Sequence, residues 1–459
     1  MVSNDIIYGS VLLLSILVGL PLRNLTSSKV KQLVTAGIGL AIALPLCQCD
    51  ILHSIVTFVG NILIIKFSRR YTAILSFAWC FLYLLFFRCC TFFMLPKPSP
   101  LANAIQLLLT LKLVSVAIEI SDLRRAKAGK VNKIEGKFQL QLEYEPTVLD
   151  MFCFTYCYAG LFTGPFFKYR TYYDYLKMDR SSLDQVPWKN EILSRLKQIA
   201  ICAILFIAAS YIVDVNYPKN DEFYSRPLWY RIWYMVPVFF IGRMRFYSAW
   251  LLAECAFVTL SLGAYPRLSA PRPGHGPTVK TEDNKDYVFE TIRNIDPYNC
   301  DFSPTVRLGM RHWNMGVQWW LANYVHKRWP ASLKGCRVAA VMAVSAFWHG
   351  IDPGFFAAFL TMPFVMAAED LLASLIKKQI SSELHNAYDW CNWFAKMRSF
   401  EYMYMAFALL TLDDTYRYWR STYFWLHFIS FFLIVSCLIV KNALSLLRRN
   451  SKPMKGKSD

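Results

Sequence analysis

The chain has 459 residues, of which 55% are hydrophobic, 16% aromatic and 18% charged, whereas a soluble domain has about 25% charged residues. Lys and Arg outnumber Asp and Glu by 50 to 31, which gives a formal net charge of +19. This composition excludes an ordinary soluble domain and disfavours a nucleic-acid-binding protein, which would need a soluble basic face. It indicates a membrane protein with a positive side.

Apolar stretches recur along the whole chain, and most approach the length of about 20 residues that a helix needs to cross a bilayer. They predict an all-α fold, a polytopic transmembrane helical bundle of about ten to twelve membrane elements. The expected segments are 6–22, 30–46, 51–67, 71–95, 101–118, 148–162, 198–215, 228–241, 246–265, 338–349, 355–376, 400–412 and 424–440. We expect them to form a single polytopic domain over residues 1–447.

Three basic stretches lie outside the apolar segments, at residues 118–147, at 168–197 and in the tail 448–459. Because Lys and Arg favour cytoplasmic loops, we expect all three to face the cytoplasm, and we expect the tail to be disordered. A further segment, 266–286, is rich in Pro, Gly and charge.

Polar side chains inside apolar runs are the informative residues of a membrane protein, because each needs a partner or a water-filled cavity. One such run, 311–321, contains Asn314 and Gln318, which are four residues apart and would share one face of a helix. Another run, 343–350, carries His349 just before a turn rich in Gly and Pro. This spacing predicts that His349 lies where a helix ends and the backbone can open to a ligand.

These two residues have structural explanations as well as chemical ones. His349 could cap a helix or bond to a backbone carbonyl, and Asn314 could form an interhelical hydrogen bond. Chemically, an imidazole can take a proton from an alcohol and pass it to a leaving group. An amide can orient that imidazole or donate to a developing oxyanion, so the pair fits acyl transfer to a hydroxyl. No H-E-x-x-H motif or His-rich cluster accompanies them, so no metal site is predicted.

Further blocks of sequence support this interpretation. They are residues 103–112, 163–172, 235–240, 243–247 and 290–296, which accompany Trp313-Asn314 and Trp348-His349-Gly350. In these residues the chain resembles the lysophosphatidylinositol acyltransferase branch of the membrane-bound O-acyltransferase family, whose active site pairs an Asn with a His. The resemblance spans nearly the whole chain and departs from the family pattern mainly at 267–285 and in the tail.

The resemblance implies that Asn314 and His349 are the catalytic residues and that the bundle encloses a catalytic chamber or tunnel. It implies transfer of a polyunsaturated, typically arachidonoyl, group from acyl-CoA to the sn-2 hydroxyl of lysophosphatidylinositol. The reaction would serve phospholipid remodelling in the endoplasmic reticulum membrane, with acyl-CoA as a co-substrate and no cofactor. Choline, serine and ethanolamine head groups stay open, because no residue pattern distinguishes them from inositol.

Four basic residues are candidates to bind the phosphates of coenzyme A or of the inositol head group. Arg243 and Arg245 are the stronger pair, because they are charges between two apolar runs, although they could instead pair with Glu254. Lys168 and Arg170 are the weaker pair, because cytoplasmic loops are ordinarily basic.

Three further residues bear on the chemistry. Gln318, four residues after Asn314, and Trp348 complete the predicted substrate contacts. Trp348 could line a lipid tunnel, although interface belts and helix packing explain most aromatic residues of such a chain. Ser345 precedes His349 by four residues, so an acyl-enzyme route competes with direct transfer to the acceptor. A hydroxyl bonded back to the preceding helical turn explains Ser345 structurally.

A transporter or a catalytically silent scaffold is the alternative of another class. A transporter would lead one to expect paired intramembrane acids and broken helices in corresponding halves. The candidate acids are few: Glu119, Asp122, Glu254, Glu369 and Asp370.

Overall fold

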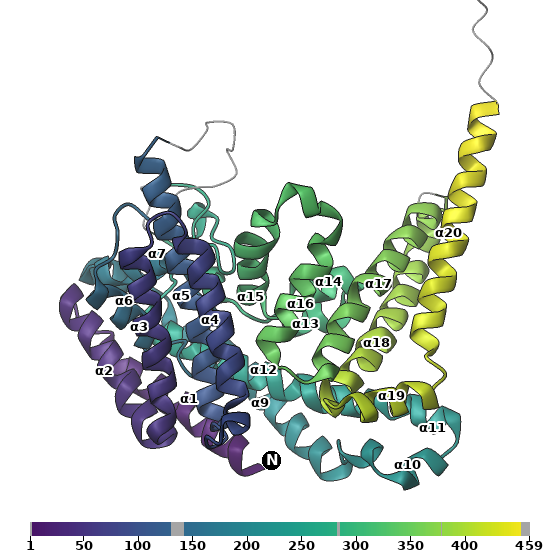
Figure 1. The fold of residues 1–459 in the computed structure, drawn as a ribbon, viewed down its shortest axis with the longest axis horizontal. Helices are drawn as coiled ribbons and strands as arrows, with labels where there is room; N and C mark the ends of the chain where they lie inside the picture. Colours follow the sequence, from purple (N-terminus) through teal and green to yellow (C-terminus); the bar gives the residue numbers. More distant parts are fainter. Residues whose placement is uncertain (1, 130–141, 282–284, 378, 451–459) are drawn as a thin grey trace, which may run out of the picture. The chain divides into compact units, whose positions relative to one another are not determined.

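The computed structural model describes all residues except 1, 130–141, 282–284, 378 and 451–459 (Figure 1). Most of the predicted tail 448–459 and part of the basic stretch 118–147 therefore lie outside the described residues. The described chain forms two compact units. Unit 1 comprises the described residues within Met1–Ile207, Arg243–Asp296 and His312–Lys334, and unit 2 comprises those within Ala208–Gly242, Pro297–Arg311 and Gly335–Asp459.

Unit 1 consists mainly of helices. They are α1 (Val2–Leu22), α2 (Ser28–Cys47), α3 (Ile51–Phe67), α4 (Thr72–Arg88), α5 (Pro100–Lys127), α6 (Val148–Tyr156), α7 (Tyr169–Lys177), α8 (Arg180–Gln185), most of α9 (Trp188–Ile212) and of α12 (Met235–Leu260), and α15 (Met315–Trp320). Two short strands, β1 (Tyr265–Pro266) and β2 (Tyr287–Val288), pair antiparallel. The chain passes between the units within α9 and α12, and again after Asp296, Arg311 and Lys334.

The described part of unit 2 contains helices and the loops that join them, and no strand. Its helices are α10 (Asp221–Ser225), α11 (Leu228–Trp233), α13 (Pro297–Phe302), α14 (Val306–Arg311), α16 (Arg337–His349), α17 (Pro353–Ile376), α18 (His385–Leu409), α19 (Leu412–Ser421) and α20 (Trp425–Asn450). Short helices of other types occur in both units. The 3-10 helices are Gln48–Asp50, Cys90–Phe93, Tyr217–Lys219, Arg267–Ser269, Glu290–Ile292, His326–Arg328, Ala331–Cys336 and Ser382–Leu384, and a π-helix spans Leu321–Val325.

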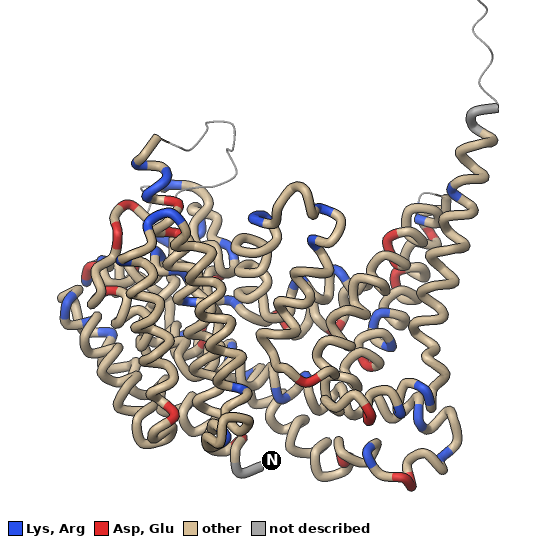
Figure 2. The backbone as a smooth tube through the Cα atoms, viewed as in Figure 1, with Lys and Arg blue, Asp and Glu red and all other residues tan. Residues whose placement is uncertain are grey.

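The all-α polytopic fold predicted from the apolar stretches is confirmed. Six described helical stretches are long and apolar enough to cross a membrane: Asn4–Leu22, Ser28–Phe67, Pro100–Lys127, Trp188–Lys219, Pro353–Ile376 and Trp425–Leu447. Other expected elements fall short of this criterion because they are short, such as α6 and α16, or charged, such as α12. Figure 2 shows long uncharged stretches along helices such as α3 and α20.

Three expected segments differ from the structure. Segments 228–241 and 246–265 were predicted as separate elements, but α12 runs unbroken from Met235 to Leu260 and carries Arg243 and Arg245 within it. Charged side chains do not break a helix, and the one proline, Pro237, lies in the first turn, where it is tolerated. Segment 148–162 ends early, because α6 stops at Tyr156 and a loop with left-handed glycines follows.

Helix α5 is the inner element of unit 1. It packs against α2, α3, α4 and α6, and most of its apolar stretch is buried inside the protein. Its backbone carbonyl at Leu111 accepts a hydrogen bond from Trp320 Nε1 of α15 at 3.0 Å. Glu119, near its C-terminal end, accepts a hydrogen bond from Tyr324 of the π-helix. The buried helix therefore fixes the segment that follows Asn314.

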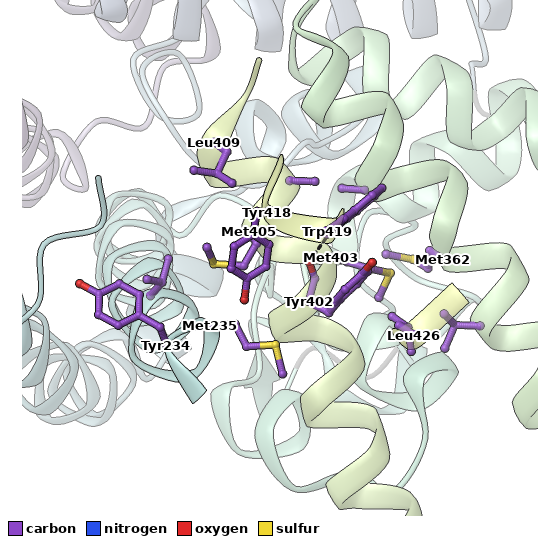
Figure 3. Close-up of a cluster of buried hydrophobic side chains, with 14 of the residues drawn as sticks. Tyr234, Met235, Met362, Tyr402, Met403, Met405, Leu409, Tyr418, Trp419 and Leu426 are labelled. Carbon is purple, nitrogen blue, oxygen red and sulfur yellow. Dashed lines mark hydrogen bonds between the residues drawn. The ribbon is translucent and has the colours of Figure 1, made fainter. Parts of the chain in front are cut away.

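The core of unit 2 gathers side chains from α12, α17, α18, α19 and α20 (Figure 3). The rings of Tyr402 and Trp419 are stacked with centroids 5.1 Å apart. Leu409, at the end of α18, is fully buried in this cluster. Burial of apolar side chains stabilises unit 2 and holds α17 and α18, which follow His349 in the chain, against each other.

Replacing Leu409 by Ala should lower the thermal stability of the protein, because truncating this buried side chain leaves a cavity that costs about 2–5 kcal/mol. Heat-unfolding midpoints of detergent-purified protein, followed by fluorescence-detected size-exclusion chromatography, measure the loss. Leu412→Ala is the matched control, since Leu412 is 61% exposed and should unfold with the wild type. Equal midpoints for the two variants would contradict the placement of Leu409 in the core.

Candidate active site

Asn314 occupies a strained turn at the start of α15 in unit 1. Its backbone has φ 46° and ψ 51°, in the left-handed region, and its side chain makes no capping hydrogen bond to the helix. Asn is among the few non-glycine residues that adopt this conformation at modest cost. The residue is 8% exposed, so its amide is available only to a group that enters the interior of the unit.

The predicted relation between Asn314 and Gln318 is wrong. Asn314 precedes α15 rather than lying within it, so the two side chains do not share a helical face. The backbone N–H of Gln318 donates to the Asn314 carbonyl at 3.1 Å, and Gln318 Nε2 donates to the carbonyl of Trp313. The left-handed turn changes the direction of the chain, which the four-residue spacing does not anticipate.

The turn at Asn314 is held by a neighbouring segment, 290–296. Met315 N donates to the Asn294 carbonyl at 2.8 Å, and Gly316 N donates to Asn294 Oδ1 at 3.3 Å. On the other side of the turn, Asp296 N donates to the His312 carbonyl at 3.0 Å. Asn294 thus supplies the acceptors that the first N–H groups of a helix require.

Segment 290–296 is itself anchored to a buried ion pair. Glu254 Oε1 accepts hydrogen bonds from Asn294 N at 2.7 Å and Ile295 N at 3.3 Å. Glu254 Oε2 accepts from Arg195 Nε at 2.9 Å, and Arg195 also contacts Glu191 at 2.5 Å. The alternative that Arg243 or Arg245 pairs with Glu254 is therefore wrong, because Arg195 of α9 occupies that position.

Close packing limits movement on both sides of Asn314. The ring of Trp313 lies against Phe246, Tyr247 and Trp250 of α12, with centroids 5.1 to 5.8 Å away. At Gly316, an added Cβ would lie 2.9 Å from the backbone nitrogen of Phe166, so only glycine fits there. Segments 163–172 and 290–296, both singled out in the sequence, therefore meet at the start of α15.

His349 belongs to unit 2, where it is the last residue of α16. The predicted helix end is confirmed, since Gly350 N closes the helix on Ala346 O at 3.0 Å and α17 begins at Pro353. The half-buried imidazole lies among the rings of Trp348, Phe355, Phe359 and Phe407, with centroids 4.8 to 6.2 Å away. Its surroundings are thus mostly aromatic.

The turn after His349 depends on two glycines. At Gly350, an added Cβ would lie 2.0 Å from the ring of Phe355, so glycine admits that ring beside the imidazole. Gly354 N donates to the Leu410 carbonyl at 2.7 Å, which ties the turn to the end of α18. Trp348 and Ser345 are both buried, and Ser345 lies one helical turn before His349 on α16.

The candidate phosphate-binding residues occupy different environments in unit 1. Arg245 is exposed and pairs with Asp5 of α1 through Nε at 2.9 Å, whereas Arg243 is half-buried on α12. Arg170 contacts Asp174 at 2.8 Å and Glu143 at 2.6 Å, so two carboxylates balance its charge.

Lys168 is buried beside the aromatic part of this region. Its Nζ lies 5.1 Å from the ring centroid of Trp319, and burial lowers the pKa of its amine to about 8, against opposing charges at Glu119 and Asp174. The centroid of the His275 imidazole lies 5.8 Å from the centroid of the same ring. Burial lowers the pKa of His275, and the nearby charge of Lys168 lowers it further. Lys168 is therefore an interior cation rather than part of an exposed basic loop.

The two settings suit different chemical steps. A buried amide in a fixed turn can donate a hydrogen bond to an oxygen that gains negative charge. A half-buried imidazole can accept a proton from a hydroxyl. Within the described ranges, no three His, Cys, Asp or Glu side chains lie close enough together to hold a metal ion.

Sequence reasoning did not identify Arg195 and Asn294 as parts of this site. Arg195 was grouped with a basic loop, and Asn294 was noted only as part of a block. The one usable signal was Glu254, an acid inside an apolar run that needed a partner.

The chain is similar to known proteins over most of its length. Residues 61–411 match the family model described as the membrane-bound O-acyltransferase family. The chain is 44% identical over 453 residues to the membrane-bound acylglycerophosphatidylinositol O-acyltransferase of Xenopus laevis, covering 96% of this chain and 95% of the relative. It is 42% identical to the human protein of that name, with 92% and 91% covered. It is 30% identical to the Drosophila melanogaster protein, with 92% and 89% covered.

The left-handed turn predicts an unusual order of stabilities at position 314. Asn314→Gly should match or exceed the wild type, because glycine adopts this backbone freely, whereas Asn314→Ala should lose about 1–2 kcal/mol. Heat-unfolding midpoints measure the order. Asn323, in the right-handed π-helix, is the matched control, since there Gly should be less stable than Ala by about 1 kcal/mol. The same order at both positions would contradict the left-handed turn.

Proposed function

The chain belongs to the membrane-bound O-acyltransferase family, and on that premise we propose that it acylates lysophosphatidylinositol. The observation that carries the proposal is the similarity, over nearly the whole chain, to relatives whose name gives acylglycerophosphatidylinositol as the acyl acceptor. The donor is an acyl-CoA, which serves as a co-substrate, and no cofactor takes part.

The proposed reaction is a direct transfer. His349 accepts the proton of the sn-2 hydroxyl as its oxygen attacks the thioester carbonyl. The carbon–sulfur bond then breaks, and the coenzyme A thiolate leaves and recovers the proton from the imidazolium. Asn314 donates its amide N–H to the oxyanion of the tetrahedral intermediate.

The environments of the two residues support these roles. Asn314 Oδ1 does not accept a capping hydrogen bond from α15, because Asn294 supplies acceptors to that helix, so the side-chain amide is not held against the helix. The aromatic rings around His349 limit competing water, which would otherwise hydrolyse the thioester.

The finer specificity belongs to the proposal as well. We infer an arachidonoyl-type polyunsaturated chain as the preferred acyl group and the endoplasmic reticulum membrane as the location, with phospholipid remodelling as the role. Arg243, Arg245, Gln318 and Trp348 remain the proposed substrate contacts. Transfer through an acyl-Ser345 intermediate, and choline, serine or ethanolamine head groups, are the alternatives.

Substitution at the two catalytic positions tests the mechanism. His349→Ala should reduce turnover by about 10² to 10⁴-fold, because the general base is lost. Asn314→Gly keeps the turn but removes the amide, so turnover should fall by about 10² to 10³-fold. Transfer of radiolabelled acyl groups by purified protein, with size-exclusion profiles as the check on folding, measures both.

His385→Ala and Ser345→Ala are the controls for this experiment. His385 lies at the start of α18 and should be dispensable, and Ser345 is dispensable if transfer is direct. Near-normal turnover in His349→Ala would refute the base assignment. A labelled acyl-enzyme on denaturing gels that is absent from Ser345→Ala would replace direct transfer by the two-step route.

Competition between substrates tests the specificity. With mixed lysophospholipids and mixed acyl-CoA donors, in membranes that lack the endogenous enzyme, lysophosphatidylinositol and arachidonoyl-CoA should be consumed first. Mass spectrometry of the product phospholipids measures the preference. Equal use of lysophosphatidylcholine would contradict the head-group assignment, and no thioester consumption with any acceptor would favour a transporter or scaffold.

A further inference from the structure

We propose that Arg195, Glu254 and Asn294 form a network that positions Asn314 for catalysis. The inference rests on the proposed role of Asn314 and adds three residues that hold its backbone but do not touch the reacting atoms. All of them belong to unit 1, as does Asn314.

The network begins at a carboxylate that must be satisfied. Glu254 is 1% exposed, and a buried carboxylate is tolerated only when its charge and its lone pairs have partners. Arg195 supplies the counter-charge on Oε2, and the backbone N–H groups of Asn294 and Ile295 occupy Oε1. This arrangement fixes segment 290–296 against α9 and α12.

The next link runs from Asn294 to the turn. Only the amide oxygen of Asn294 can accept from Gly316 N, and its backbone carbonyl accepts from Met315 N. These two N–H groups directly follow Asn314 in the chain. The bond from Asp296 N to His312 O ties down the residues that precede it. Asn314 is therefore held from both sides by one segment.

The backbone conformation of Asn314 explains why these hydrogen bonds are needed on both sides of it. A non-glycine residue in the left-handed region persists only where its surroundings over-determine it. An asparagine at the start of a helix ordinarily accepts a hydrogen bond from a backbone N–H of the first turn through its own side chain. Here Asn294 Oδ1 accepts from Gly316 N instead. The hydrogen bonds from segment 290–296 thus maintain the left-handed backbone of Asn314, and the side-chain amide of Asn314 makes no capping bond that would keep it from a ligand.

The alternative is that the ion pair only stabilises the fold. Catalysis distinguishes the two, because a displacement of about 1 Å in a catalytic group can cost up to about 100-fold in rate. A positioning network should therefore affect kcat more than KM, and it should affect the mobility of the turn at Asn314.

Glu254→Gln is the principal test. The amide can still accept from Asn294 N but no longer matches the Arg195 charge, so kcat should fall by about 10- to 100-fold while KM changes by less than about threefold. Hydrogen exchange of the full chain in nanodiscs should show faster exchange at residues 290–296 and 312–318. Exchange in α16 should stay unchanged.

Two further variants serve as controls. Glu369→Gln alters a half-buried carboxylate that accepts a backbone N–H, from Val306 in unit 2, and should leave exchange at 312–318 unchanged. Arg195→Met leaves the Glu254 charge without its counter-charge, so among the single variants of the network it should lower kcat the most. Adding Glu254→Gln to it removes the unpaired charge and should restore kcat by about tenfold.

The outcomes separate this inference from the proposed function. Unchanged exchange at 312–318 in Glu254→Gln would overturn the network, and faster exchange with unchanged kcat would overturn its role in catalysis. If the wild type transfers no acyl group to lysophosphatidylinositol, the proposed function fails, while the exchange data still decide whether the network holds the turn.

Discussion

The buried carboxylate of Glu254 is the interaction on which the arrangement of unit 1 depends. A charge taken out of water is costly, so it is retained only while its partners stay in place. Those partners come from α9 and from segment 290–296, and the carboxylate itself comes from α12. An electrostatic requirement far from position 314 in the sequence thereby fixes the backbone at the start of α15.

Much of the fold follows from the lengths of the apolar stretches. Residues 51–67 form α3 with the predicted bounds, between the 3-10 helix Gln48–Asp50 and the turn that follows Phe67. The prediction failed where it placed a helix boundary at charged residues, because Arg243 and Arg245 lie inside α12. Arg245 is tolerated there because it is exposed and pairs with Asp5. Helix ends depend on backbone capping and glycine conformation, as at Tyr156, and hydropathy does not report these.

The site was predictable only in part, because some of its interactions join residues that are far apart in the sequence. Asn314 and His349 stood out as polar side chains in apolar surroundings, which is a local signal. Asn294 acts through hydrogen bonds to residues about twenty positions away, and no local pattern encodes them. The aromatic rings of Phe359 and Phe407 meet His349 through the packing of α17 and α18, which likewise has no signature in a single segment.

The left-handed turn has a consequence for how this position can change during evolution. Its backbone restricts it to Asn, Asp or Gly, and the proposed chemistry requires an amide, so the two demands overlap in a single amino acid. A change to Gly would leave the fold intact and escape the quality control that removes unstable proteins. Loss of activity by such a route would leave a well-expressed, inert membrane protein, a path open to duplicated genes.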